Sequence, residues 1–387
     1  MQIITISHNE EGRRLDRYLV KVLPGAGLSF ICKMLRKKNI TVNGAKAHPD
    51  QKLNEGDRIR MFFSDETYEK LLDPNRMTTS DQTADTADLH ENYDGPLQDP
   101  VDKTKASLKT GGSGVKRNDP ATYIRAYSMI GDIDIIYEDG DFIFVDKPFG
   151  VLSQKSVEKD VSMNEWLVGR CLDLGELTED DLTSFKPAFA NRLDRNTSGL
   201  ILGGKTLKAL QILSSLLKER DMHKYYLCLA MGKPDDRLPV TNMDFTDIRG
   251  FLVKDKVNNI SRVYDNMEKA PNADMVLTGF KLVEQYEDPD RMLLEIDLHT
   301  GKSHQIRAQL SALGHPIIGD AKYGMNNEGG KNAGNIKRSG CLTIDNDRGR
   351  TGQLLHAYRV VFPDLPQWPA ISGREFVTKK PDLVKKF

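Results

Sequence analysis

Residues 189–200 read FANRLDRNTSGL, and the interpretation of the whole chain starts from this stretch. It sets one carboxylate, Asp194, between two guanidinium groups, Arg192 and Arg195. Two cations within reach favour the ionised carboxylate, so we expect Asp194 to be charged at neutral pH. Small turn residues and the apolar run 200–202 follow. Taken alone, such a composition is most often a surface loop with a satisfied salt bridge.

The same stretch also satisfies a nucleotide-binding pattern. Residues 199–206, GLILGGKT, match G-x-x-x-x-G-K-[ST], which is typical of phosphate loops. A phosphate loop needs backbone amides that turn inward, whereas the bulky residues 200–202 favour an extended strand. We therefore expect a strand here, and a nucleotide triphosphatase is the least favoured of the possible functions.

The composition is that of an ordinary globular chain. Of the 387 residues, 39% are hydrophobic and 29% are charged, and this length allows two or three domains. No apolar run is long enough to cross a bilayer and the N-terminus lacks a secretion signal, so we expect a cytoplasmic protein without membrane contact. The four cysteines are far apart and the histidines match no metal-binding motif. We therefore expect no disulfide framework, no metal and no cofactor in the chemistry.

The N-terminal part is basic, although the whole chain has a net charge of -1. Residues 7–60 hold twelve Lys and Arg against six Asp and Glu, a local charge of +6. Apolar residues at helical spacing predict helices over residues 13–22 and 29–38, the second with Ser29 as its N-cap. The pair Asn43-Gly44 then predicts a tight hairpin turn. Four basic side chains of the second helix are candidates for phosphate contacts: Lys33, Arg36, Lys37 and Lys38.

This order of two helices, a strand and an Asn-Gly turn resembles the S4 RNA-binding domain. The resemblance implies an RNA-binding module over residues 1–64. The next segment is acidic, since residues 65–102 hold eleven Asp and Glu against two Lys and Arg, a local charge of -9. Its polar composition cannot bury enough apolar surface to offset the entropy of ordering. We therefore expect residues 65–122 to be a disordered linker, followed by a domain over 123–387.

Three stretches of this last domain predict its local structure. Residues 133–148 predict two strands joined at 138–141, which end in the turn KPFG. A core-facing helix is predicted by the spacing of four leucines, and a strand over residues 224–232 follows it. These leucines are Leu207, Leu210, Leu213 and Leu217. Residues 292–314 predict a strand and a short helix ended by Gly314, with His304 and Arg307 sharing a face that points into a cleft.

The pattern R-L-D-x-x-T-S-G-L at 192–200, together with KPFG at 147–150 and TGKSHQIR at 300–307, resembles the RluA-type pseudouridine synthases. The resemblance, which is to the RluC and RluD type with an N-terminal S4 domain, extends from residue 132 to 362. It implies an α+β catalytic domain with a mixed, largely antiparallel sheet flanked by helices. It also implies three catalytic residues: Asp194 as the nucleophile, Tyr226 against the uracil, and Arg307 as the charge partner of Asp194.

The resemblance further implies residues that contact RNA. Arg192, two residues before the aspartate, would occupy the space left by a flipped-out uridine or hold phosphates. The other candidates for RNA contacts in this domain are Arg195, Lys302, His304 and Gln305. Ile317 and Leu200 are expected as walls of the pocket. Two positions depart from the family pattern, because Asn191 replaces a common His and Lys302 replaces a common Arg that could contact phosphate through two nitrogens.

These observations predict a monomeric RNA pseudouridine synthase that acts on large-subunit ribosomal RNA and needs no cofactor. The alternative substrate is tRNA. The alternative class is a noncatalytic RNA-binding or ribosome-assembly protein on the same scaffold. The presence of Asp194, Tyr226 and Arg307 argues against that class.

Overall fold

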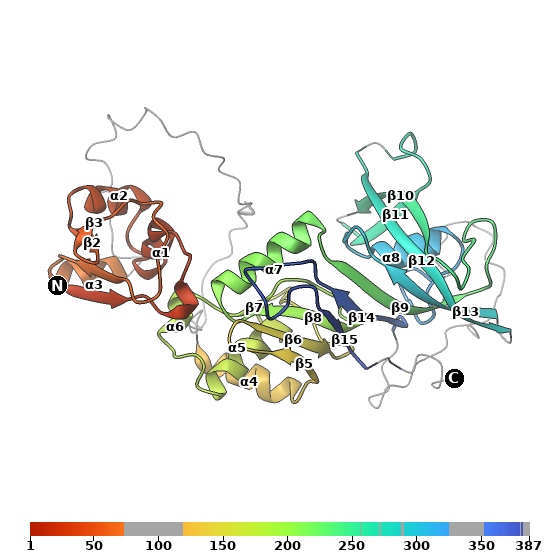
Figure 1. Cartoon of the computed structure of the whole chain (residues 1–387), viewed down its shortest axis with the longest axis horizontal. Helices are drawn as coiled ribbons and strands as arrows, with labels where there is room; N and C mark the ends of the chain where they lie inside the picture. The colour runs from red at the N-terminus through yellow and green to blue at the C-terminus, as the bar shows by residue number, and fades with distance from the viewer. Residues whose placement is uncertain are drawn as a thin grey trace. The chain divides into compact units, whose positions relative to one another are not determined.

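The basic N-terminal part and the 189–200 motif lie in two different units of the computed structural model (Figure 1). The structure describes residues 1–72, 119–255, 257–270, 272–287, 290–324, 352–379 and 381. The first unit comprises Met1–Ala121 and Leu177–Lys186, and the second comprises Thr122–Glu176 and Pro187–Phe387. Among the described residues, no helix is both long enough and apolar enough to span a membrane.

The first unit combines a small antiparallel sheet with short helices. Its sheet has the strand order β1-β4-β2-β3. Its elements are β1 (Gln2–Thr5), η1 (His8–Glu10), α1 (Leu15–Val22), α2 (Leu28–Arg36), β2 (Ile40–Val42), β3 (Ala45–Lys46), β4 (Arg58–Met61), α3 (Asp65–Leu72) and α6 (Asp181–Ser184). The predicted hairpin is confirmed, because Asn43 and Gly44 join β2 to β3 with φ of 53° and 79°, the left-handed values that a two-residue turn requires.

The predicted helices of this unit are present, with two corrections. Helix α2 begins at Leu28 with Gly27 as its N-cap, so Ser29 lies inside the helix and the predicted serine cap is wrong. Gly27 is the cap because its backbone is extended while its carbonyl already accepts the first helical hydrogen bond, from the amide of Ile31 at 3.1 Å. Residues 65–72, expected in the linker, form α3, because Leu71 is fully buried in the core of this unit. The other end of the expected linker is also structured, since α4 (Pro120–Ile130) begins within residues 119–122. The rest of the expected linker, 73–118, lies outside the described residues.

The second unit is built on one mixed sheet. The 11-stranded sheet has the order β11-β10-β12-β13-β9-β14-β8-β6-β5, with β15 on β14 and β7 on β8. Its strands are β5 (Ile135–Glu138), β6 (Phe142–Lys147), β7 (Ala188–Phe189), β8 (Ser198–Gly204), β9 (His223–Met231), β10 (Thr246–Asp255), β11 (Ile260–Tyr264), β12 (Asp274–Glu287), β13 (Asp290–Asp297), β14 (Leu355–Val361) and β15 (Glu375–Val377). Its helices are α4 (Pro120–Ile130), α5 (Met163–Asp173), α7 (Leu207–Glu219) and α8 (Gln305–Ala312).

Within this sheet, β8 pairs in parallel with β14, and the other strand pairs are antiparallel. The α+β class and the mixed, largely antiparallel sheet are therefore confirmed. Residues 199–204 lie in β8 and pair with β6 along their whole length, so they form no phosphate loop. Gly199 has a φ of 116°, and a Cβ there would lie 2.1 Å from the carbonyl oxygen of Ala357. Only glycine allows β14 to approach so closely at the end of the motif.

Helix α7 buries a face slightly different from the predicted one. Ala209, Leu213 and Leu216 are buried, whereas Leu207, Leu210 and Leu217 are half-buried. Thr206 caps the helix by accepting from the amide of Ala209 at 3.3 Å, and this cap is itself buried. The side chains at 209, 213 and 216 pack against Leu200 and Leu202 of β8, directly after the motif.

Candidate active site

The loop between β7 and β8, which carries Asp194, is held by a buried hydroxyl. Ser153 Oγ donates to the carbonyl oxygen of Leu193 at 2.9 Å and accepts from the amide of the same residue at 3.0 Å. Asn191 ties the beginning of the loop to β8, since its Oδ1 accepts from the amide of Leu202 at 2.8 Å. Both backbone groups next to Asp194 are thereby fixed, and its carboxylate projects from a rigid support.

Lys147 holds the same loop from the other side. Its side chain is fully buried, and Nζ donates to the carbonyl oxygens of Pro148 at 3.0 Å, Val151 at 2.8 Å and Arg195 at 3.2 Å. Burial lowers the pKa of Lys147 to about 7, and the nearby Asp194 carboxylate opposes this shift. The three acceptors use all three protons of the ammonium form, so Lys147 joins the KPFG turn to the motif loop.

Asp194 forms an ion pair with Arg307 of α8. Asp194 Oδ2 lies 2.6 Å from Arg307 Nη1, although the two residues are far apart in sequence. The other side of this guanidinium binds Asp320, whose oxygens accept from Nε at 2.7 Å and from Nη2 at 2.9 Å. The Asp320 side chain is fully buried, while that of Asp194 is 29% exposed. The buried carboxylate therefore orients Arg307, and Arg307 in turn orients the accessible one.

The two carboxylates raise the pKa of Arg307 despite its burial, and Arg307 lowers the pKa of Asp320. His304 lies on the opposite side of Asp194, with its Nε2 3.8 Å from Asp194 Oδ1. Its Nδ1 lies 2.8 Å from the hydroxyl of Tyr323, whose ring also packs under Arg307. Burial lowers the pKa of His304, which favours the neutral ring.

Tyr226 lies on β9 and lines the same cleft as Asp194 and Arg307. Only 8% of this residue is exposed, and burial together with the Asp194 carboxylate raises the pKa of its hydroxyl. The cleft has a volume of about 770 Å³. A neutral aromatic ring beside an accessible carboxylate can hold a flat, uncharged base against that carboxylate.

Among the described residues that line this cleft, Asp194 is the one carboxylate, and the other charged groups are cationic. The cations are Arg192, Arg195, Lys218, Arg220, Lys224, Lys302, Arg307 and Lys322. Walls of one sign of charge attract a polyanion such as the nucleic-acid backbone. The arrangement therefore suits a nucleophilic carboxylate that acts on a nucleic-acid substrate.

Comparison with known proteins agrees with this chemistry. Residues 141–312 match the RNA pseudouridylate synthase family. An RNA pseudouridine synthase of Mycoplasma genitalium is 26% identical over 385 residues, which cover 99% of this chain and 96% of the relative. The ribosomal large subunit pseudouridine synthase C of Vibrio vulnificus is 26% identical over 329 residues, 84% of this chain and 80% of the relative.

The chain carries an RNA pseudouridylate synthase domain over residues 141–312. It is accordingly an isomerase that acts on RNA. Among solved structures, human RNA Pseudouridylate Synthase Domain Containing 4 has 18% sequence identity and covers 67% of this chain and 94% of its own, with a TM-score of 0.49.

The structure of this synthase places the predicted catalytic residues in one cleft and shows which cation pairs with Asp194. Asp194, Tyr226 and Arg307 all line the cleft. The partner of Asp194 is Arg307, and among the described residues no ion pair joins Asp194 to its neighbours Arg192 and Arg195, which are exposed. The cation that pairs with Asp194 therefore comes from α8 and not from its own loop.

The predicted RNA-contacting residues of the synthase differ in accessibility. Arg192, Arg195, Lys302 and His304 line the cleft with part of their surface exposed. Gln305 is only 2% exposed, and its amide bonds inside the protein to Thr300 Oγ1 at 2.9 Å and to Thr278 Oγ1 at 2.9 Å. Gln305 is among the residues that line the cleft, but its side chain already fixes the start of α8 to β12, and its contact with RNA stays a prediction.

The prediction of the apolar walls of the pocket is wrong. Ile317 and Leu200 are buried and are not among the residues that line the cleft, whose apolar lining includes Leu298 and Leu355. Sequence reasoning missed Asp320 and the anchoring role of Lys147. No local pattern reveals which group either residue contacts. A lysine or an aspartate inside an apolar run signals only that a buried polar contact exists.

Proposed function

We propose that this protein isomerises specific uridines of large-subunit ribosomal RNA to pseudouridine, with Asp194 as the nucleophile. The observation that carries the proposal is the accessible Asp194 carboxylate, held by the buried Arg307–Asp320 pair in a cleft whose other charged side chains are cationic. The ribosomal substrate is supported by the relatives named ribosomal large subunit pseudouridine synthase C. Because one chain supplies all the proposed catalytic residues, we propose that a monomer is the active form.

The reaction breaks the bond between uracil N1 and ribose C1′, forms a bond between uracil C5 and C1′, and moves the C5 proton to N1. No electron is gained or lost, so a nucleophile and proton transfers suffice. Asp194 adds to the sugar or to the base and is released when the new carbon bond has formed. Arg307 holds and aims this carboxylate through a charge-assisted hydrogen bond. Tyr226 lies against the uracil, and its raised pKa keeps the hydroxyl protonated.

A uridine inside a helix cannot reach Asp194, so the base must rotate out of its stack. Arg192 is exposed on the cleft wall two residues before Asp194, where its guanidinium can occupy the vacated space or bind the flanking phosphates. Lys302 Nζ lies 2.8 Å from Asp274 Oδ1, and 36% of the lysine side chain is exposed. It can therefore also contact backbone phosphates. These two side chains position the RNA and take no part in bond formation.

For residues 1–64 we propose an S4-like RNA-binding domain. Helices α1 and α2 pack Leu15, Leu19, Ile31 and Leu35 inward. Arg36, Lys37 and Lys38 are exposed at the C-terminal end of α2, and Lys33 is half-buried. Such a cluster contributes affinity through phosphate contacts and offers no nucleophile. We therefore assign target binding to this domain and chemistry to the cleft.

The test of the nucleophile is Asp194→Asn, with Asp236→Asn as the matched control, since Asp236 is exposed and lies outside the cleft lining. On purified large-subunit RNA, Asp194→Asn should abolish pseudouridine formation and keep RNA binding, while the control should keep both. Retained isomerisation by Asp194→Asn would remove this carboxylate from the mechanism. Lost RNA binding with intact folding would give it a binding role in place of a catalytic one.

The test of the substrate is a map of pseudouridine across total RNA from cells with and without the gene. We expect sites in large-subunit RNA to disappear when the gene is removed and to return with the wild-type gene but not with Asp194→Asn. Sites that disappear only from tRNA would overturn the ribosomal assignment while leaving the reaction itself intact.

A further inference from the structure

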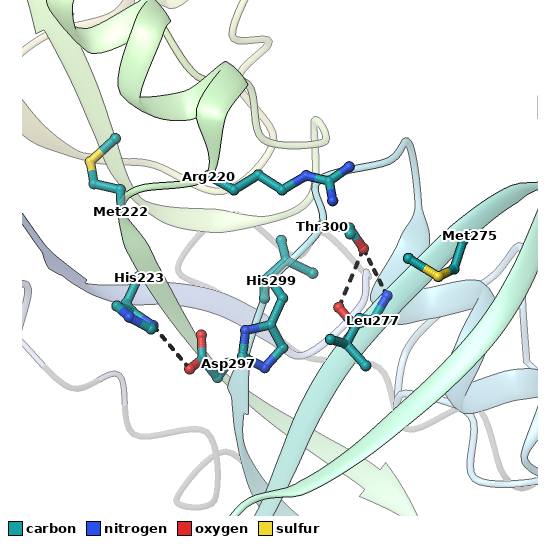
Figure 2. Close-up of a pocket in the computed structure, with 9 residues that line it drawn as sticks. Arg220, Met222, His223, Met275, Leu277, Asp297, His299 and Thr300 are labelled. Atoms are coloured by element: carbon teal, nitrogen blue, oxygen red, sulfur yellow. Dashed lines mark hydrogen bonds and ion pairs between the residues drawn. The ribbon is translucent and has the colours of Figure 1, made fainter.

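A second, smaller cavity of about 150 Å³ lies beside the cleft (Figure 2). Its lining includes His223 at the start of β9, Asp297 at the end of β13, and His299 just beyond it. Arg220, Leu298 and His299 line both this cavity and the cleft. The proposed reaction uses none of the three residues His223, Asp297 and His299.

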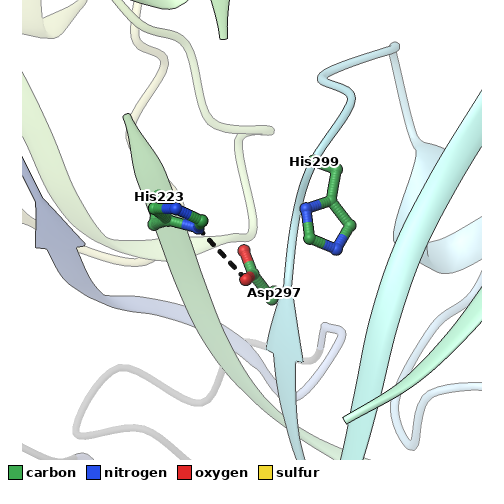
Figure 3. Close-up of side chains that lie close together, drawn as sticks. All are labelled: His223, Asp297 and His299. Carbon is green, nitrogen blue, oxygen red and sulfur yellow. Dashed lines mark hydrogen bonds and ion pairs between the residues drawn. The ribbon is translucent and has the colours of Figure 1, made fainter. Parts of the chain in front are cut away.

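Strand register brings these three side chains to one face of the sheet. Asp297 is paired with Tyr225, and the amide of Leu298 donates to the carbonyl oxygen of Lys224 at 2.9 Å. One further step along both strands sets His223 opposite His299. Because side chains alternate between the two faces, Asp297 and His299 point to the same side, and His223 faces them from the neighbouring strand. Figure 3 shows the Asp297 carboxylate between the two rings.

The distances within this cluster suit a shared metal ion. One ligand atom from each residue lies within 4.8 Å of the other two. His223 Nδ1 and Asp297 Oδ2 are 3.3 Å apart, which is long for a charge-assisted hydrogen bond. Two ligands bound at about 2.0–2.1 Å to a tetrahedral ion are separated by about 3.3 Å. Asp297 Oδ1 is buried and has no hydrogen-bond partner within the described part of the chain. The side chain as a whole is 9% exposed.

A second carboxylate orients one of the imidazole rings. His299 Nε2 lies 3.1 Å from Asp247 Oδ1 of β10, which leaves Nδ1 of the same ring for the cluster. Asp247 and Asp297 are both paired with Gly279 of β12, which lies between them. A Cβ at Gly279 would come within 2.9 Å of Asp247 Oδ1, so the absence of a side chain there lets Asp247 reach His299. A carboxylate that receives the N–H of a ligating histidine is the usual outer partner in metal sites.

We propose that His223, Asp297 and His299 bind one transition-metal ion of the zinc class. Two imidazoles and one carboxylate are donors that Zn²⁺ prefers, whereas Mg²⁺ and Ca²⁺ prefer oxygen ligands throughout. Water completes the fourth position from the open side, where the His223 side chain is 58% exposed. Asp247 and Asp297 balance the charge of the ion, and Arg220 is the cation that faces the same cavity.

The ion would join the start of β9 to the segment between β13 and α8. The first of these elements carries Tyr226 and the second leads to Arg307, so the site would fasten together two segments that support the cleft. It stabilises the folded chain by mass action because the three ligands meet only when β9 and β13 are paired.

The experiment titrates Zn²⁺ into the metal-free full-length chain by calorimetry, with the same titration on single variants. Wild type should bind one equivalent at this site. His223→Gln and His299→Gln should each weaken binding at least tenfold, and Asp247→Asn should weaken it about 10–100-fold. The matched control is His8→Gln, which breaks the other His/carboxylate group of the described residues, His8, Glu11 and Glu55, and should leave this affinity unchanged.

Two further measurements keep the test decisive. Thermal melting in the presence of a chelator should be the same for wild type and His223→Gln, because this histidine is largely exposed, and Zn²⁺ should raise the melting temperature of wild type alone. Co²⁺ should give wild type the visible absorption of a tetrahedral site, and His223→Gln should lose it. Absence of Zn²⁺ binding, or binding that His8→Gln removes and His223→Gln keeps, overturns the proposal.

Discussion

Asp320→Asn and Asp194→Asn test how the two carboxylates share one guanidinium. Asp320 is fully buried, and its oxygens accept from Arg307 and from the backbone amides of Lys322 at 2.9 Å and Tyr323 at 3.1 Å. Oδ1 accepts from three donors, Arg307 Nη2 and these two amides, while Oδ2 accepts from Arg307 Nε. An asparagine whose oxygen stays at the Oδ1 position places its NH2 group against Arg307 Nε, so two donors face each other. The guanidinium, whose side chain is 9% exposed, also loses the carboxylate that neutralises it.

Breaking a buried ion pair by removing one partner costs about 3–5 kcal/mol. In a unit of this size, 1 kcal/mol lowers the melting temperature by about 2–4 °C, so we expect Asp320→Asn to melt on the order of 10 °C lower. The Asp194 side chain is 29% exposed, so water can take over the polar contacts that its carboxylate makes. Asp194→Asn should therefore change the free energy of unfolding by less than about 1 kcal/mol.

The two variants should rank in the opposite order for loss of isomerisation activity. Asp194→Asn should abolish isomerisation in a stable protein, whereas Asp320→Asn should leave residual isomerisation in a destabilised one, because the nucleophile is still present but poorly aimed. The assay combines urea unfolding with single-turnover pseudouridine formation on the same preparations, at a temperature where both variants are folded. If Asp320→Asn were as stable as wild type, or if Asp194→Asn were the more destabilised variant, the assignment of Asp320 as the support and Asp194 as the reactive group would be refuted.

Three further predictions concern pH, backbone geometry and RNA affinity. Burial, aided by Lys147, lowers the pKa of His356 to about 4, so the unfolded chain binds more protons below pH 6.5. This group's contribution to stability is complete above pH 6.5 and is lost as the pH falls to 4, which amounts to about 3 kcal/mol in urea unfolding. His356→Gln should flatten that part of the pH profile. Gly199→Ala should cost more than about 3 kcal/mol, since its Cβ would meet the backbone of Ala357 and its φ is positive; a melting temperature like that of wild type would contradict this. Replacing Arg36, Lys37 and Lys38 together by alanine should lower the slope of log affinity against log salt by about 2 to 3, and an unchanged slope would remove these side chains from the RNA contact.

Much of the local structure could be predicted from the sequence because it depends on neighbouring residues. Helix α1, the Asn43-Gly44 hairpin, the β5–β6 pair and the strand at 198–204 each follow from side-chain period or turn chemistry within about ten residues. The resemblance to a known family added Asp194, Tyr226 and Arg307, which local composition alone could not single out. Errors at this level concern helix ends and faces, such as the N-cap of α2, since packing against other elements decides them.

The sequence by itself thus determined which residue types were available and where strands and helices form, whereas tertiary structure decided which of their side chains meet. The cations nearest to Asp194 in the chain are Arg192 and Arg195, yet its ion-pair partner is Arg307, because the tertiary fold brings this guanidinium of α8 to 2.6 Å from the carboxylate. Gln305 matches a motif for RNA contact, and its side chain is bonded inside the protein. The His223, Asp297 and His299 cluster exists only through the register of β9 with β13, because a contact across a sheet depends on pairing and leaves no spacing in the sequence.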